Sequence, residues 1–505
     1  MKFDLYGSLT MSKNVEEIKD EIKEFIDSAN QDLLSRGAPE GRGAKVTGWS
    51  IEGDKISLNI TSEQYVRAHD ALIRLKKGIG DTLGKKHKVG ARSAQVDEYL
   101  ITFTTEKDPM DPVTIPFISD ISFDANICTL TLKDVTEEFL SHNYIDRMIK
   151  LVNEKVENQY YEGKSEKWEL MWESGPKEPV WNKDPTEVMI INDWLKMGPE
   201  KGKWFFRPEA AAVVNAMKEI AVDEILAPLG FQEIIESHHV SFDIWLKTGH
   251  IEGSPNELYY VCEPKTRDTK TWERFRDLIK ITRQVPKDEL VNLIAAPNAG
   301  CCYAQCPVIY WSFASKVIAD ESLPVLVYDR TANSNRYESG GRHGIERVDE
   351  FHRIEPTYIG TPEQLVELRE KMIDRYKYVF NEILELDWRM AWVTPWYLEQ
   401  AGQIDKDDKK EKIIGTIDFE AYLPYRGTRE DSEWLEFQNL SILGDKFIKP
   451  FNIKAQKAEL WSGCSGIGLE RWTAAFLAQK GLEFDKWPKK FQEKIGKMPP
   501  GIKFM

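Results

Sequence analysis

The segment over residues 174–185, SGPKEPVWNKDP, holds three prolines and one glycine. Because proline fixes its own φ angle and donates no backbone hydrogen bond, such a segment neither continues a helix nor fits inside a sheet. We therefore expect an N-terminal domain over residues 1–165, a linker over 166–185 and a C-terminal domain over 186–505. Length alone, at 505 residues, allows about three domains.

Net charge excludes one class of function. The chain has 68 Lys and Arg against 83 Asp and Glu, a formal net charge of −15, so it does not coat nucleic acid through bulk positive charge. The N-terminus carries no apolar signal segment, and we expect a cytoplasmic protein. Its six cysteines are then expected to be reduced, and to bind metal or be buried rather than form disulfides.

One uncharged stretch, Leu290 to Ser315, is long enough to raise the question of a membrane span. Its polar and helix-breaking residues, Pro297, Asn298 and Pro307 among them, would be poorly satisfied in lipid. We expect buried strands of a protein core in this stretch.

In the N-terminal domain, segments with the two-residue hydrophobic period of strands alternate with segments that have the 3.6-residue period of helices. Strand patterns cover residues 2–11, 44–51, 55–61, 97–104, 114–121 and 127–132, and helix patterns cover 14–35, a segment from about 62, and 134–162. This mixed order predicts an α+β domain with a largely antiparallel sheet. Between Arg67 and Arg92 eight residues are basic and two acidic. A phosphate-binding surface and a solvated helix end explain that run about equally well.

The most informative segment of the C-terminal domain is NRYESGGRHGIERVDEFHRIE, residues 335–355. On a strand, Arg336 and Glu338 would share one face, as would Arg347, Phe351, Arg353 and Glu355 on the returning arm. Arginine forks suit phosphate oxygens, and a phenylalanine ring can stack on a nucleobase. The alternative is an exposed hairpin with scattered ion pairs. It would not explain why functional side chains are spaced to share one face on both strands of the hairpin.

Two further segments flank it. In the first, Pro208 begins a long helix that Gly230 ends, and a strand follows to about residue 237. In the second, WSGCSGIGLERWTAA, a glycine-rich turn leads into a helix whose first turns contain Arg471. Each pattern alone is weak.

In this order the three segments resemble motifs 1 (about 207–237), 2 (about 335–355) and 3 (about 463–475) of class II aminoacyl-tRNA synthetases. The proline usual in motif 1 is absent, and Ser237 or His238 stands there. The resemblance covers about residues 190–505. It implies an α+β fold: a catalytic core made of an antiparallel sheet flanked by helices, preceded by the separate N-terminal α+β domain, in a homodimer formed through motif 1.

Cysteine placement narrows the family. In a class II fold Cys306, Glu355 and Cys464 would meet at the floor of the amino-acid pocket and leave zinc an open fourth position. The alternative is that both cysteines are merely buried hydrophobes. Threonyl enzymes bind this metal with one Cys and two His, whereas the methanogen-type (type 2) seryl-tRNA synthetases use Cys, Glu and Cys. The chain resembles the second family, also in CYAQCPVIYW, FHRIEP and WVTPWYLEQ, and its N-terminal domain resembles that family's tRNA-binding domain.

The resemblance implies ATP-dependent activation of L-serine and its transfer to the 3′ end of tRNA(Ser), with one Zn²⁺ per subunit and Mg²⁺ with ATP. It implies the following roles. The catalytic residues are Arg336 and Arg471. ATP contacts Arg336, Tyr337, Glu338, Arg347, Val348, Phe351, Glu436 and Arg471. Serine contacts Ala304, Arg336, Arg353, Glu355, Trp396, Gln400 and Asn439. Zinc is held by Cys306, Glu355 and Cys464, and Mg²⁺ by Glu436 and Asn439. The tRNA contacts Lys85, Lys86, Lys88 and Arg92.

Two expectations follow from these assignments. A helix-turn-strand insertion near 392–410 would cover serine with Trp392 and Trp396. Glu436 and Asn439 differ in strand parity, so both reach one site only if a bulge or strand end lies between them. A threonyl-type enzyme, or a synthetase-like protein without catalysis, are the alternatives.

Overall fold

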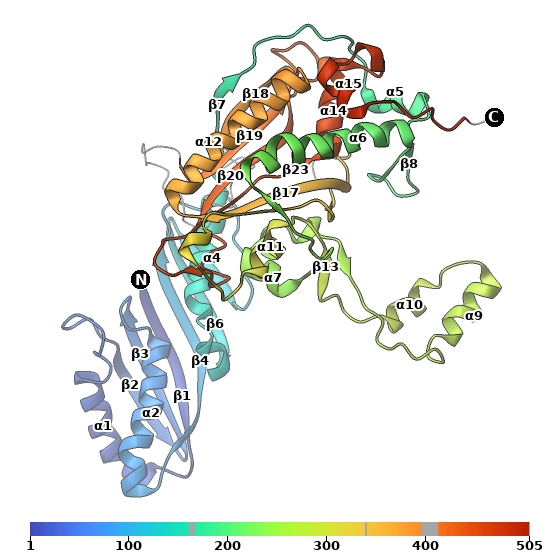
Figure 1. Ribbon diagram of the computed structural model, residues 1–505. Coiled ribbons are helices and arrows are strands. Elements are labelled where there is room, and N and C mark those ends of the chain that lie inside the picture. Colours follow the sequence, from blue (N-terminus) through green and yellow to red (C-terminus); the bar gives the residue numbers. More distant parts are fainter. Residues whose placement is uncertain (161–166, 339–340, 395–412, 504–505) are drawn as a thin grey trace. The chain divides into compact units, whose positions relative to one another are not determined.

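The computed structural model describes residues 1–160, 167–338, 341–394 and 413–503. The chain divides into two compact units, Met1–Ser165 and Glu166–Met505, shown in Figure 1. Within the described part of the chain, every helix is too short or too polar to cross a membrane.

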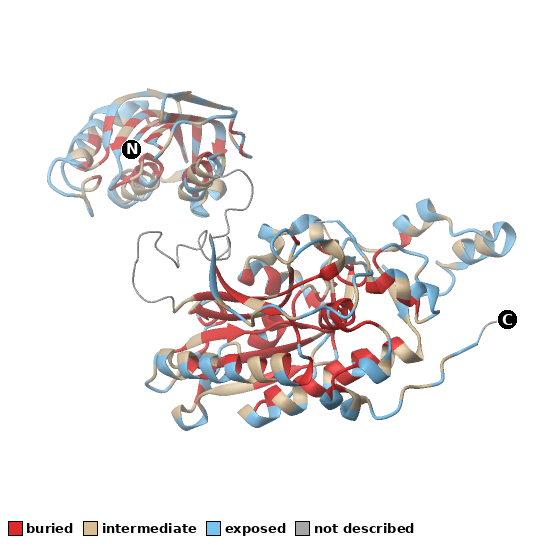
Figure 2. Cartoon of the chain, turned by 90° about the horizontal axis from the view of Figure 1, so that it is seen from above, coloured by how far each residue is buried: buried red, intermediate tan, exposed pale blue. Residues whose placement is uncertain are grey.

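Unit 1 is a six-stranded antiparallel sheet in the order β2-β3-β1-β4-β6-β5, with helices packed on it. Its core lies between the helices and the sheet, as the buried residues in Figure 2 show. The elements are β1 Lys2–Met11, α1 Lys19–Gln31, β2 Lys45–Glu52, β3 Lys55–Glu63, α2 Ala68–His87, β4 Ala91–Thr104, β5 Asp120–Asp124, β6 Ile127–Thr136, α3 Glu137–Ser141 and α4 Tyr144–Asn158. The predicted antiparallel α+β architecture is confirmed for this unit.

Two boundaries in unit 1 differ from the prediction. The helix expected over 134–162 is two helices, α3 and α4, because Asn143 adopts φ 55° between them. The strand expected at 114–121 begins only at Asp120. Pro116 lacks a ladder donor and Phe117 has φ 70°, so neither fits a strand.

Unit 2 contains a large sheet in the order β10-β15-β17-β22-β20-β19-β18-β7. All neighbouring strands are antiparallel except β10 and β15. The strands are β7 Lys167–Glu173, β10 Gln232–Glu233, β15 Val325–Asp329, β17 Glu350–Gly360, β18 Trp388–Thr394, β19 Gly415–Ala421, β20 Leu435–Gly444 and β22 Trp461–Cys464, with β16 Asn333–Asn335 and β23 Ile467–Gly468 beside β17.

Helices cover one face of this sheet and enclose the main core with it (Figure 1). They are α5 Pro185–Ile191, α6 Pro208–Ile220, α12 Pro362–Tyr378, α14 Leu469–Lys480 and α15 Lys489–Ile495. A smaller core lies around α7 Phe242–Thr248 and α11 Cys306–Ser312. β11 His239–Ser241 precedes α7. Between α7 and α11 the chain forms β12 Tyr260–Val261, the helical hairpin of α9 Glu273–Thr282 and α10 Lys287–Leu293, and β13 Ala299–Cys301.

Three predictions for unit 2 need correction. Residues 166–185 are not all linker, because β7 pairs with β18 at the sheet edge. The uncharged stretch is not mainly strands: Pro307 stands in the first turn of α11, where a proline costs no hydrogen bond. The strand of motif 1 is only β10, two residues long.

Candidate active site and metal centre

Three elements bring a group of metal-ligating side chains together. Cys306 begins α11, Glu355 lies within β17 and Cys464 ends β22. Their ligand atoms all lie within 4.8 Å of one another. The three side chains are buried, at 6%, 0% and 9% exposure, so the predicted triad meets in the fold.

The carboxylate of Glu355 is buried next to one guanidinium, that of Arg353. Neither of its oxygens accepts a hydrogen bond among the described residues, although Arg353 Nε lies 2.5 Å from Oε2. Burial raises the pKa of Glu355, and the hydrogen bond with Cys464 together with burial raises the pKa of the Cys306 thiol. A buried carboxylate beside two buried thiols costs free energy, which a bound divalent cation would lower.

The donor set fits zinc. Two soft thiols and one hard carboxylate are ligands that zinc, a borderline cation, accepts at tetrahedral geometry. Three protein ligands leave one position open, as in zinc sites that bind a substrate.

Arg336 lies just beyond β16 rather than on a strand, which corrects the predicted strand face it would share with Glu338. Its backbone N–H donates to the Asp349 carbonyl at 2.9 Å, and Glu338 N–H donates to the Asp349 side chain at 3.1 Å. Asp349 is buried, yet hydrogen bonds from Arg342 and Tyr259 hold its pKa below the usual range. Asp349 therefore positions both ends of the Arg-x-Glu sequence.

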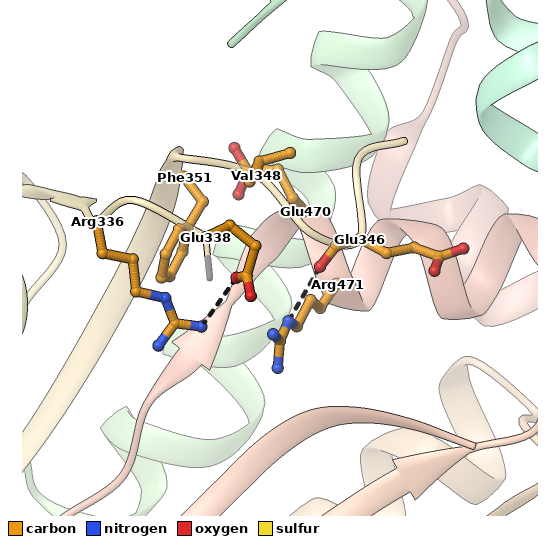
Figure 3. Close-up of a pocket in the computed structure, with 7 residues that line it drawn as sticks. All are labelled: Arg336, Glu338, Glu346, Val348, Phe351, Glu470 and Arg471. Atoms are coloured by element: carbon orange, nitrogen blue, oxygen red, sulfur yellow. Dashed lines mark hydrogen bonds and ion pairs between the residues drawn. The ribbon is translucent and has the colours of Figure 1, made fainter. Parts of the chain in front are cut away.

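The Arg336 guanidinium lies between two rings. Its central carbon is 5.6 Å from the Phe351 ring centroid and 5.9 Å from that of Tyr303, and Figure 3 shows Phe351 beside it. Tyr303 is held in turn by a 2.7 Å hydrogen bond to Glu257. Arg336 Nε is buried and has no hydrogen-bond partner among the described residues, so it can donate to a ligand.

Arg471 and Arg347 also have carboxylate partners. Arg471 Nη1 donates to Glu436 at 3.1 Å, and its Nε donates to the Glu346 carbonyl at 3.1 Å (Figure 3). Arg347 precedes β17 instead of sharing its face, which corrects the prediction, and it pairs with Glu433. Val348 is buried and Tyr337 is half exposed beneath Arg342, 4.5 Å from its guanidinium.

The predicted bulge is present. The β19–β20 register shifts between Phe419 and Glu420, where Phe437 is the extra residue on β20. Glu436 and Asn439 thereby line one cavity of about 80 Å³ together with Arg353 and Arg471. Asn439 Oδ1 already accepts from the Gly466 N–H at 2.8 Å, so a metal would compete with that bond.

Some residues that were predicted to cover serine lie outside the described residues or in the core. Trp396, Gln400 and most of the insertion near 392–410 fall outside the described residues. Trp392 is not part of an insertion, because it belongs to β18 and is 4% exposed in the core. Ala304 is buried beside Cys306.

The basic run of unit 1 is partly neutralised. Arg67 pairs with Asp146, Lys76 with Glu137 and Lys86 with Glu21. Lys88 caps α2, and Arg92 is the exposed second residue of β4. Lys85 lies in the last turn of α2. Charge counting along the sequence does not reveal these internal pairs.

Sequence reasoning missed Tyr303, Glu257, Glu346, Arg426 and Glu433. Arg426 links Glu433, at 2.7 Å, to buried Glu346, at 2.6 Å. Burial raises the pKa of Glu346 to about 7. The Arg426–Glu346 and Tyr303–Glu257 contacts join segments 80 and 46 residues apart, so no local pattern signals them.

Comparisons with known proteins agree on one family. A model described as tRNA-binding domain matches residues 1–154. The type-2 serine–tRNA ligases of Methanococcoides burtonii and Methanothrix thermoacetophila are each 44% identical, over 506 and 511 residues, with 100% of both chains covered. The M. kandleri SerRS, in its crystal structure with A. aeolicus tRNASec, matches with a TM-score of 0.88 at 30% identity, covering 100% of this chain and 99% of that one.

An antiparallel sheet that carries an arginine-lined pocket, next to a glycine-rich turn into a helix, is the catalytic core of a class II aminoacyl-tRNA synthetase, as predicted. Sequence identity of 44% over the full length identifies the family within this class. The chain belongs to the type-2 serine–tRNA ligases, which sets aside the threonyl-type alternative.

Proposed function

We propose that this ligase converts L-serine and ATP to seryl-adenylate and then transfers the seryl group to the 3′ end of tRNA(Ser). One observation carries the proposal: Arg353 and Glu355 lie two residues apart on one face of β17. Arg353 lines the arginine-rich cavity, and Glu355 belongs to the metal-ligating triad. This strand would therefore hold the α-phosphate of ATP next to serine.

The first step requires that serine and ATP be positioned for attack, and it requires no proton transfer. The serine carboxylate is ionised at pH 7 and can attack the α-phosphate without a general base. Arg336 would hold that phosphate and the serine carboxylate, because its Nε has no internal acceptor. Phe351 would stack on adenine, with Glu338 accepting from the adenine amino group.

The outer phosphates require neutralisation of charge as pyrophosphate leaves. Arg347 and Arg471 would bind them after exchanging their present carboxylate partners. Glu436 and Asn439 would hold the Mg²⁺ that accompanies ATP. Glu436, once released by Arg471, has a carboxylate free for this metal.

Cys306, Glu355 and Cys464 would hold zinc, whose open coordination position supplies a site for the serine amino group. Ala304, next to Cys306, would line the serine pocket. Trp396 and Gln400 would cover serine on the remaining side.

Unit 1 would bind tRNA(Ser), as its match to a tRNA-binding domain supports. Lys85, Lys86, Lys88 and Arg92 would contact phosphates. We also propose that the enzyme acts as a homodimer through the motif 1 region, residues 207–237.

ATP–pyrophosphate exchange with each amino acid tests the activation step, with zinc content measured on the same protein. We expect exchange with serine alone and one zinc per chain. Active protein without zinc would refute the metal assignment, and exchange with another amino acid in preference to serine would refute the substrate.

Charge reversal in the full chain tests the tRNA surface. Lys86→Glu with Lys88→Glu should weaken tRNA(Ser) binding, most strongly at low salt, should reduce the salt dependence of the affinity, and should leave serine-dependent exchange unchanged. Charging of tRNA(Ser) at the wild-type rate would contradict this surface.

A further inference from the structure

Unit 1 carries a cluster of aromatic rings at its surface, which we call the ring cluster: Phe117, Phe139, His142 and Tyr144. The Phe117 and Tyr144 rings are almost parallel, at 9° with centroids 6.1 Å apart, and His142 stacks on Tyr144 at 5.2 Å and 21°. Phe139 meets both Phe117 and Tyr144 edge-on, at 5.6 and 4.9 Å. The four rings therefore form one continuous aromatic surface.

Phe117 is the exposed end of the ring cluster. Its side chain is 70% exposed, the largest such value among the aromatic residues that the structure describes as exposed. The backbone of Phe117 has φ 70°, a left-handed conformation that a bulky residue rarely adopts. Such a backbone conformation costs free energy, which the contacts of the surrounding loop must offset.

The loop that carries Phe117 is held on both sides. Val113 and Ile115 are buried in the core of unit 1. Lys155 of α4 donates to the Thr114 carbonyl at 2.8 Å, and Ser119 N–H donates to the Thr131 carbonyl at 2.7 Å. The ring is thus presented by a fixed loop, so stacking on it would cost little ordering.

Positive charge lies beside the ring cluster. Arg147 is three residues beyond Tyr144 on α4 and so shares its side of the helix. Arg147 is exposed and makes no ion pair or hydrogen bond within the described residues. Two nearby acids are already neutralised, Asp146 by Arg67 at 2.9 Å and Glu137 by Lys76 at 2.6 Å.

We propose that the ring cluster is a stacking platform for an unpaired nucleobase of the bound tRNA, with Arg147 contacting the adjoining phosphate. Exposed aromatic faces next to arginine are the usual means by which proteins hold single-stranded RNA. The inference rests on the proposed binding of tRNA(Ser) by unit 1 and adds the place and mode of one contact.

The test uses full-length protein and tRNA(Ser) transcript. Phe117→Ala should weaken binding about five- to hundredfold, the range for loss of one base stack. Phe117→Trp keeps a stacking face and should retain wild-type affinity. Tyr6→Ala is the matched control, because Tyr6 is 46% exposed on β1 and alternates with the core residues Phe3 and Leu5; its affinity should be unchanged.

Salt dependence separates the two parts of the platform. Arg147→Gln should reduce the slope of log affinity against log salt by about one phosphate contact, and Phe117→Ala should leave that slope unchanged. Serine-dependent pyrophosphate exchange, with the thermal transition, reports whether each variant is folded. Wild-type affinity of folded Phe117→Ala would overturn the platform. Failure of the wild-type protein to bind tRNA(Ser) would instead refute the proposed function.

Discussion

Around Phe351 each arginine expected to contact ATP is paired with a carboxylate, whereas around Cys306 the buried carboxylate of Glu355 accepts no hydrogen bond. In the first pocket ATP must therefore replace internal ion pairs. The second region gathers three side chains that could hold a cation. A shared strand, β17, therefore joins one region with several internal ion pairs to one whose ligand set fits a metal ion.

Loss of a metal ligand should have the largest effect on activity and should separate the two regions most clearly. Cys464→Ala removes a thiol that no neighbour replaces, and we expect zinc loss and a fall in serine-dependent exchange of more than about a hundredfold. Cys302→Ala is the matched control, since Cys302 is a buried thiol outside the triad. Zinc analysis and the pyrophosphate-exchange assay test this prediction. If Cys464→Ala retained zinc, the metal site would not depend on this thiol.

Arg336→Ala should reduce adenylate formation about a hundred- to thousandfold, because its Nε has no substitute donor for the reacting groups. Zinc should stay bound, as the triad does not include this residue. Single-turnover adenylate formation and zinc content, measured together, test the independence of the two regions. Loss of zinc in this variant would show that they are coupled.

Glu346 should make the stability of the folded protein depend on pH. Burial raises its pKa to about 7, so the folded protein keeps a proton that the unfolded chain releases above about pH 4.5. The wild type should therefore lose stability, by at most about 3 kcal/mol, as pH rises from 4.5 through 7. Glu346→Gln should lack this part of the loss. The thermal transition of unit 2 at pH 5 and pH 8 measures it, and equal losses in both proteins would contradict the raised pKa.

Glu433→Gln should produce the smallest effect. Its side chain is 59% exposed, so the pair with Arg347 is weak, and neutralising it should lower the KM for ATP about two- to fivefold. Glu430→Gln, three residues earlier and outside the pocket lining, serves as the control. An increased KM would mean that Glu433 helps to bind ATP instead of competing with its phosphates.

Motif order and strand parity predicted part of the site, whereas the strand face expected for Arg336 and Glu338 and the place of Arg347 on the returning strand were wrong. Arg353 and Glu355 share a face of β17, and the parity conflict between Glu436 and Asn439 predicted the bulge at Phe437. That the triad would meet could be stated only through the family resemblance, because spacing along the chain does not bring residue 306 to residue 464.

What could not be predicted depends on tertiary packing. A short apolar run fits a strand or a buried helix equally well, so α11 was expected as a strand. The partner of Arg347, Glu433, is 86 residues away in the chain. The edge strand β7 follows an undescribed stretch and is recognisable only from its pairing with β18.

The narrow space at Gly466 has a consequence for how this site can change by mutation. A Cβ atom at position 466 would lie 2.2 Å from Arg353 Nη2, so a larger residue there forces the guanidinium to shift. Because Arg353 lines the arginine-rich cavity, such a shift would displace a group that is expected to contact serine. The two positions are therefore coupled, and substitutions at 466 and 353 should have non-additive effects on activity.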